Sequence, residues 1–141
     1  MRYWAYKVDT YEGPAADIRM FVVYFDPKAF ERLSDSLGLQ KGLIGVVYAY
    51  ASRKLAEKDN VVIAHELLHT VGATDKYDFT TRQPIHPDGY AEPDRQPLFP
   101  QKMAEIMGCR IPLSETKSDM PESLEDTVIG VKTAKEIKWV K

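Results

Sequence analysis

Residues 61–75 read Val-Val-Ile-Ala-His-Glu-Leu-Leu-His-Thr-Val-Gly-Ala-Thr-Asp, and this stretch decides how the rest of the chain is interpreted. On a helix that advances about 100° per residue, His65 and His69 project from one face, one turn apart. The apolar residues of the stretch occupy the opposite arc, so the back of the helix can be buried while the imidazoles face a cleft. This spacing predicts a zinc ion shared by the two histidines, with Glu66 placed as a general base.

Three segments ahead of this helix predict β-strands, because they are rich in aromatic and β-branched residues. They are residues 3–8, 18–25 and 43–52. Between the second and the third, Asp26 can cap a helix whose first residue is Pro27 and which stops at Gly38. The N-terminal half is therefore predicted to be a small twisted mixed sheet packed on helices, an α+β fold.

The C-terminal half is predicted to be mostly irregular. The helix with the two histidines is expected to begin at Asp59 or Asn60 and to end at Gly72. Residues 74–100 then contain five prolines, which favours a long loop. Short helices are expected at residues 101–107 and 131–138. With 141 residues, the whole chain, residues 1–141, is predicted to form a single catalytic domain.

Composition excludes several classes of function. The net charge is −2 and no long basic run occurs, so nucleic acid is not an expected partner. Cys109 is the only cysteine, which excludes an internal disulfide framework and cysteine-rich zinc fingers. No stretch is long and apolar enough for a membrane span or a signal peptide. These features favour a monomer without a membrane span and leave its localisation undecided.

The pattern His65-Glu66-x-x-His69-x-x-Gly72-x-x-Asp75 resembles the signature of the metzincin clan of zinc endopeptidases. Most members have histidine as the third ligand, and some have aspartate. The resemblance implies that His65, His69 and Asp75 bind zinc, that Glu66 is the general base, and that Gly72 turns the chain back towards the metal. It also implies a metzincin-like fold in which the metal helix lies under an edge strand.

Other features of the clan match less closely. The clan has a methionine in a tight turn beneath the metal, and the resemblance implies this role for Met107. A tyrosine that stabilises the transition state in some members, two residues after that methionine, is replaced here by Cys109. Tyr77 or Tyr90 would have to supply that contribution. The edge strand that pairs with an extended peptide substrate would be residues 43–50.

Alternative metal ligands follow from the chemistry of the remaining side chains. A rival group of zinc peptidases takes its third ligand from a glutamate further downstream on a second helix, and a resemblance to that group would nominate Glu92 or Glu105 in place of Asp75. His86 and Cys109 are further candidates. A weaker prediction is a calcium ion that pins the long loop through its acidic residues. These acids are Asp78, Asp88, Glu92 and Asp94.

The sequence therefore predicts a zinc-dependent hydrolase with one catalytic ion, most simply a metalloendopeptidase that acts on peptides or proteins. Zinc lowers the pKa of bound water towards about 7 and polarises a carbonyl, while a nearby carboxylate accepts the proton. Two alternatives remain: a zinc amidase that acts on a non-protein amide, and a catalytically inactive zinc domain that binds peptides. Retention of Glu66 favours an enzyme, because a structural zinc needs four protein ligands and no adjacent base.

Overall fold

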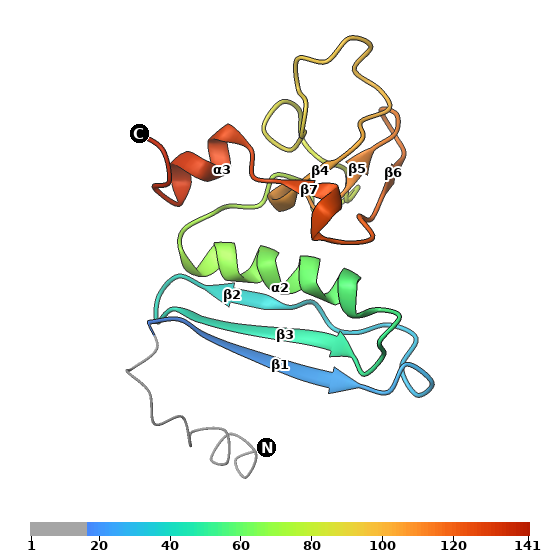
Figure 1. The fold of residues 1–141 in the computed structure, drawn as a ribbon, viewed down its shortest axis with the longest axis vertical. Helices are drawn as coiled ribbons and strands as arrows, with labels where there is room; N and C mark the ends of the chain where they lie inside the picture. Colours follow the sequence, from blue (N-terminus) through green and yellow to red (C-terminus); the bar gives the residue numbers. More distant parts are fainter. Residues whose placement is uncertain (1–16) are drawn as a thin grey trace.

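The computed structural model describes residues 17–141 and has an α+β fold with a mixed three-stranded sheet and two α-helices (Figure 1). The strand predicted at residues 3–8 lies outside the described residues. The larger elements are β1 (Arg19–Phe25), β2 (Leu37–Leu39), β3 (Ile44–Tyr50), α2 (Ala56–Thr70) and α3 (Val131–Glu136). Four two-residue strands form two small ladders in the C-terminal half: β4 (Ala104–Glu105) with β7 (Thr127–Val128), and β5 (Ile111–Pro112) with β6 (Ser118–Asp119). Two 3-10 turns, at Ile106–Gly108 and Leu124–Asp126, complete the set.

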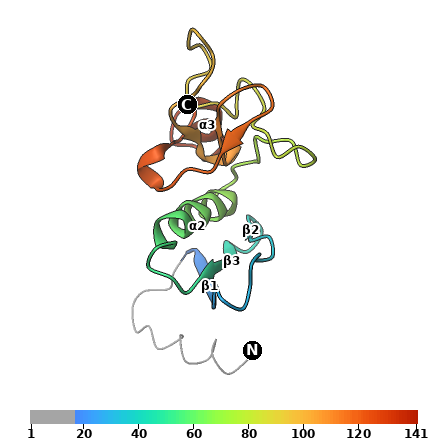
Figure 2. The same cartoon turned by 90° about the vertical axis from the view of Figure 1, so that its right-hand side faces the viewer.

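Helix α2 forms the middle layer of the molecule, with the sheet on one side and the C-terminal half on the other (Figures 1 and 2). Alternate residues of β3, including Val47 and Ala49, are fully buried beneath the helix. A buried apolar cluster packs the other side of α2 against the C-terminal half. Its members are Leu68, Ala73, Ile106, Met107 and Ile137. Because both sides of α2 are packed, the helix is a rigid base for the side chains at its C-terminal end.

The strand order is β1-β3-β2, with β1 parallel and β2 antiparallel to β3. The prediction that the strand of residues 43–50 lies at the edge of the sheet is therefore wrong. Strand β3 is central, because β1 and β2 form ladders on its two sides. The edge strand next to α2 is β2. At Gly38 it lies so close that a Cβ atom would collide with the backbone oxygen of Glu66.

The prediction of a helix from Pro27 to Gly38 is wrong. The side chain of Asp26 accepts a hydrogen bond from the Lys28 N–H, and the backbone carbonyl of Asp26 accepts one from the Phe30 N–H. The turn that these bonds begin does not continue into a helix. The chain becomes extended instead, and Leu37, Gly38 and Leu39 pair with β3. Ladder bonds to a distant strand thus override the local helical spacing of apolar residues.

The C-terminal half agrees with the prediction in most of its length. Residues 74–100 contain no helix or strand and make only isolated bridges, and α3 matches the predicted final helix closely. The prediction of a helix at residues 101–107 is wrong. Ala104 and Glu105 pair with β7, and only one 3-10 turn follows them. Helix α2 begins at Ala56, one turn before the predicted start.

Glu105 stabilises this turn with a fully buried carboxylate. One oxygen, Oε2, accepts hydrogen bonds from the N–H groups of Met107 and Gly108, at 2.7 and 2.9 Å. The other, Oε1, accepts from the Gly130 N–H at 3.1 Å and from the Thr133 hydroxyl at 2.6 Å. The side chain therefore ties the 3-10 turn to the start of α3.

We expect Glu105→Ala to lower the free energy of unfolding by about 3 kcal/mol or more, because it leaves several buried donors without an acceptor. Urea denaturation measures this change. Glu92→Ala is the control: Glu92 is exposed, so the variant should stay within about 0.5 kcal/mol of the wild type. A loss of less than about 1 kcal/mol in Glu105→Ala would show that water replaces these bonds readily.

Within residues 17–141, neither helix combines the length and the apolar character that a membrane span requires.

Candidate metal centre

The C-terminal end of α2 turns sharply at Gly72, as the sequence predicts. The Gly72 N–H donates to the His69 carbonyl at 3.1 Å, and the Ala73 N–H donates to the Leu68 carbonyl at 3.0 Å. This is the hydrogen-bond pattern of a Schellman motif, which needs a residue in the left-handed region. Gly72 has φ 107°, a conformation that glycine adopts without strain. The turn directs the chain back across the face that carries the histidines.

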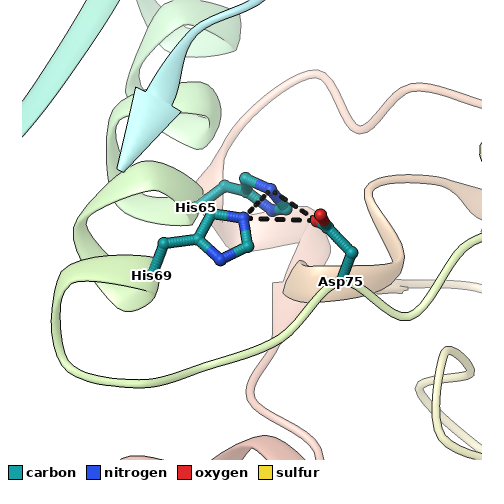
Figure 3. A group of neighbouring side chains, drawn as sticks. All are labelled: His65, His69 and Asp75. Atoms are coloured by element: carbon teal, nitrogen blue, oxygen red, sulfur yellow. Dashed lines mark hydrogen bonds and ion pairs between the residues drawn. The ribbon is translucent and has the colours of Figure 1, made fainter. Parts of the chain in front are cut away.

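Three side-chain atoms meet at this turn (Figure 3). The Nε2 atoms of His65 and His69 are 3.0 Å apart, and each lies 3.2 Å from Oδ1 of Asp75. The two imidazoles come from α2 and the carboxylate from the loop that follows it. The structure thus brings together the three residues that the sequence singles out as metal ligands.

The second nitrogen of each imidazole fixes the tautomer. Nδ1 of His65 lies 3.0 Å from the Ile106 carbonyl, and Nδ1 of His69 lies 2.8 Å from the Ala73 carbonyl. A carbonyl oxygen only accepts, so each Nδ1 carries the proton and donates it. In the neutral rings both Nε2 atoms are then bare lone pairs, directed at each other and at a carboxylate oxygen. Three acceptors this close repel one another unless a cation or an added proton lies between them.

The spacing fits one metal ion. A tetrahedral zinc with bonds of about 2.0 to 2.2 Å holds its ligand atoms roughly 3.3 to 3.6 Å apart, which is close to the separations found here. Donation of each Nδ1 proton to a backbone carbonyl is the usual outer hydrogen bond of a metal-binding histidine. Among residues 17–141, the group of His65, His69 and Asp75 is the one set of three such side chains that could hold a metal ion.

The charges at the site also favour a cation. Burial lowers the pKa of His65, but the Asp75 carboxylate and Cys109 outweigh this effect, so the pKa lies well above its usual value. Burial likewise raises the pKa of Asp75, but the hydrogen bonds and charges of the two histidines hold it well below the usual range. The field that draws a proton to these atoms draws a divalent cation as well.

Glu66 lies beside this group, in the wall of a cleft of about 450 Å³. Burial raises the pKa of Glu66, and this effect exceeds the opposing influence of the two histidines and of a hydrogen bond from the Gly38 backbone N–H. A carboxylate with a raised pKa is a stronger base. The N–H of Gly38 belongs to β2, so the edge strand contacts both the helix and the side chain next to the metal group.

The cleft runs between β2 and the loop that follows Asp75. Residues of both walls line it, and among those named next the sequence indicated only Tyr77 as a candidate site residue. They are Asp35, Ser36, Leu37 and Gly38 on the β2 side, with Tyr77, Phe79 and Arg82 on the loop side. Within this set, Tyr77 is one of the two tyrosines considered for transition-state stabilisation. Burial, together with the negative charge of Asp75, raises the pKa of Tyr77 to about 12, so its hydroxyl keeps its proton at neutral pH.

Tyr90 does not line this cleft. Its ring is buried in the long loop, where it packs against His86 and Phe99. The structure therefore separates the two tyrosines, and only Tyr77 is placed to reach a molecule bound in the cleft.

Met107 is fully buried in the 3-10 turn below α2. The preceding residue, Ile106, supplies the carbonyl that orients His65. Cys109 follows the turn in the left-handed conformation, with φ 64°, and its Sγ lies 3.3 Å from Nδ1 of His65. Sγ is thus closer to the outer nitrogen of His65 than to Nε2, at 3.9 Å, which faces Asp75. Cys109 therefore contacts His65 but does not belong to the metal-binding group of His65, His69 and Asp75.

The alternative ligands lie elsewhere. The Glu105 carboxylate is occupied by its four internal donors. Glu92 pairs with Arg95, and Nε2 of exposed His86 lies 3.1 Å from the Pro93 carbonyl. In the part of the chain that the structure describes, none of these joins a metal-binding group, and neither do the acids considered for calcium. These acids are Asp78, Asp88, Glu92 and Asp94.

A pair of residues that the sequence does not reveal holds the loop that carries Asp75. Lys76 is almost fully buried, and its Nζ donates to Oε2 of Glu136 at 2.8 Å. Burial raises the pKa of Glu136, but the hydrogen bonds from Lys76 and Thr74 lower it by more than burial raises it. The pKa of Glu136 therefore lies below its usual value. Glu136 therefore stabilises the fold in its charged form. That stability is present above the unfolded pKa of about 4.3 and is lost as the pH falls through the folded pKa.

The expected consequence is that Glu136→Gln destabilises the metal-free protein at pH 7, and that the difference from the wild type shrinks below about pH 4. Acid protonates Glu136 in the wild type and makes the two side chains alike. Urea denaturation at several pH values measures the difference in the free energy of unfolding between the two proteins. Asp75 titrates in both proteins, so its contribution cancels in this difference. A difference that stays constant down to pH 3 would contradict the assigned ion pair.

Comparison with known proteins finds no match: no family model, no curated protein and no solved structure resembles the chain.

Proposed function

We propose that this protein is a zinc-dependent hydrolase. Within this class we propose that it is a metallopeptidase with a metzincin-like metal site. The observation that carries the proposal is the convergence of Nε2 of His65, Nε2 of His69 and Oδ1 of Asp75, with the carboxylate of Glu66 beside them in an open cleft. Zinc bound there would supply an activated water and polarise a carbonyl group.

The side chains around the group support the roles that hydrolysis requires. Glu66 would accept a proton from the attacking water and pass it to the leaving amine, a transfer that its raised pKa assists. Tyr77 keeps its hydroxyl proton and could donate a hydrogen bond to the oxygen on which negative charge develops. In the sequence, Cys109 stands where some metzincins have a tyrosine, so Tyr77 would act instead from the loop that follows Asp75.

The edge strand β2 supports a peptide as the substrate. It pairs with β3 on one side only, and its residues Leu37 and Gly38 line the cleft. The Gly38 N–H is bonded to Glu66, so an extended peptide could add to the outer edge through the main-chain groups of β2 that Glu66 does not occupy, and so lie across the metal group. This assigns to β2 the role that the sequence had placed on residues 43–50.

Incubation of the zinc-loaded protein with a mixture of unstructured peptides tests the proposal. We expect cleavage products by mass spectrometry, their loss on treatment with a zinc chelator, and their return when zinc is added. Small N-acyl compounds in a parallel reaction detect the alternative amidase activity. Binding of peptides without cleavage of either substrate class would indicate the inactive peptide-binding domain and would refute the proposed activity.

A further inference from the structure

The carboxylate of Glu136, at the end of α3, holds the two neighbours of Asp75. Oε2 accepts a hydrogen bond from the Thr74 N–H at 3.0 Å and one from Nζ of Lys76 at 2.8 Å. Oε1 accepts from the Thr74 hydroxyl at 2.9 Å. One side chain, 61 residues further along the chain than Asp75, thus binds the residue before it and the residue after it.

The group around Glu136 is buried on the side of Lys76, whereas Thr74 is exposed. Nζ of Lys76 also donates to the Thr74 carbonyl at 2.8 Å, and the Lys76 N–H donates to the Met107 carbonyl at 2.9 Å. The side chains of Lys76 and Glu136 are only 4% and 17% exposed. The bond from Lys76 to Glu136 is charge-assisted and shielded from water, so it holds the backbone after Asp75 firmly, and the two bonds from Thr74 hold the backbone before it.

The Asp75 side chain has little support of its own. Among the described residues, Oδ1 is buried, and it faces only the two Nε2 atoms; it has no separate hydrogen-bond donor. Its position therefore depends on the backbone that carries it. The same segment supplies the Ala73 carbonyl that orients His69, so a shift of this loop would misplace two of the three atoms together.

We propose that Glu136 is a positioning residue of the metal site: by fixing Thr74 and Lys76, it holds the Asp75 carboxylate at the distance from His65 and His69 that one ion requires. Glu136 does not touch the ion and acts through the backbone of residues 74–76. This inference rests on the proposed metal site and adds a residue from a distant helix to it. Partners of metal ligands commonly change metal affinity by about 10- to 100-fold when they are removed.

Zinc affinity, measured by competition with a chromophoric chelator, tests this inference in the full chain. We expect Glu136→Ala to bind zinc about 10- to 100-fold more weakly than the wild type. The matched control is Ile137→Val, which removes a core methyl group from the next residue without touching Thr74 or Lys76. It should bind zinc like the wild type. The absorption spectrum of the cobalt-loaded protein should change in Glu136→Ala and stay unchanged in the control, because only the former moves a ligand.

Glu136→Ala leaves Lys76 buried without its counter-charge, so circular dichroism must first show that the variant folds. If it does not, Glu136→Gln replaces it, and we expect at least about threefold weaker binding from the lost ion pair. Unchanged affinity in the folded variant, or equal weakening in Ile137→Val, would overturn the positioning role. Failure of the wild type to bind zinc would instead refute the metal site itself, so the two claims fail separately.

Discussion

Replacing Glu66 with glutamine should lower the rate of hydrolysis by about 10²- to 10⁴-fold and leave zinc binding unchanged. The amide keeps the size of the side chain and its place in the cleft wall, but it cannot accept a proton from water. His65 and His69, its neighbours on α2, keep both their Nε2 atoms and their bonds to backbone carbonyls. The change thus separates proton transfer from metal binding.

The measurement combines initial rates on a cleaved peptide with the zinc content of the purified variant. Glu57→Gln is the matched control, since Glu57 lies in the first turn of the same helix and is exposed. It should retain full activity. Equal activity in Glu66→Gln and the wild type would remove Glu66 from the mechanism, whereas loss of zinc in Glu66→Gln would mean that the side chain acts as a ligand.

The second large effect is on stability. Zinc at about 1,000 times its dissociation constant should raise the free energy of unfolding by about 4.1 kcal/mol, because the ion binds the folded chain. The thermal midpoint should rise by on the order of 10 °C.

Thermal unfolding with and without zinc measures this effect. His69→Ala should abolish the zinc-dependent rise, because it removes one of the three ligand atoms. His86→Ala is the control: His86 is exposed and lies outside the site, so its removal should leave the full rise in place. A rise that persists in His69→Ala would place zinc at another site on the chain.

Helix α2 and the strands β1 and β3 were predictable from sequence because their signals are local. The spacing of His65 and His69, the apolar back of α2 and the glycine at position 72 all lie within one short stretch. The third atom of the group, from Asp75, follows from the resemblance to metzincins, since spacing alone left Glu92, Glu105, His86 and Cys109 open. The structure separates these alternatives because it shows where the loop returns after Gly72.

Other features depend on contacts between distant segments. Residues 37–39 form an edge strand because β3 offers them a ladder, although Phe30, Leu33 and Leu37 recur at helical spacing. Glu105 reads as an ordinary helical glutamate, yet it lies buried among donors from residues up to 28 positions away. The bond from Thr74 to Glu136 spans 62 positions. No local pattern marks Glu136 as a partner of this loop, since it lies 61 positions beyond Asp75 in the sequence.

The central claim is that His65, His69 and Asp75 bind one zinc ion, and a crystal structure of the zinc-loaded protein tests it most directly. We expect one ion bound by Nε2 of both histidines at about 2.0 to 2.1 Å and by an oxygen of Asp75 at about 2.0 to 2.2 Å. One coordination position should remain open towards the cleft. A bond from Glu105, Glu92, His86 or Cys109 in place of Asp75, or a site without zinc under these conditions, would contradict the account.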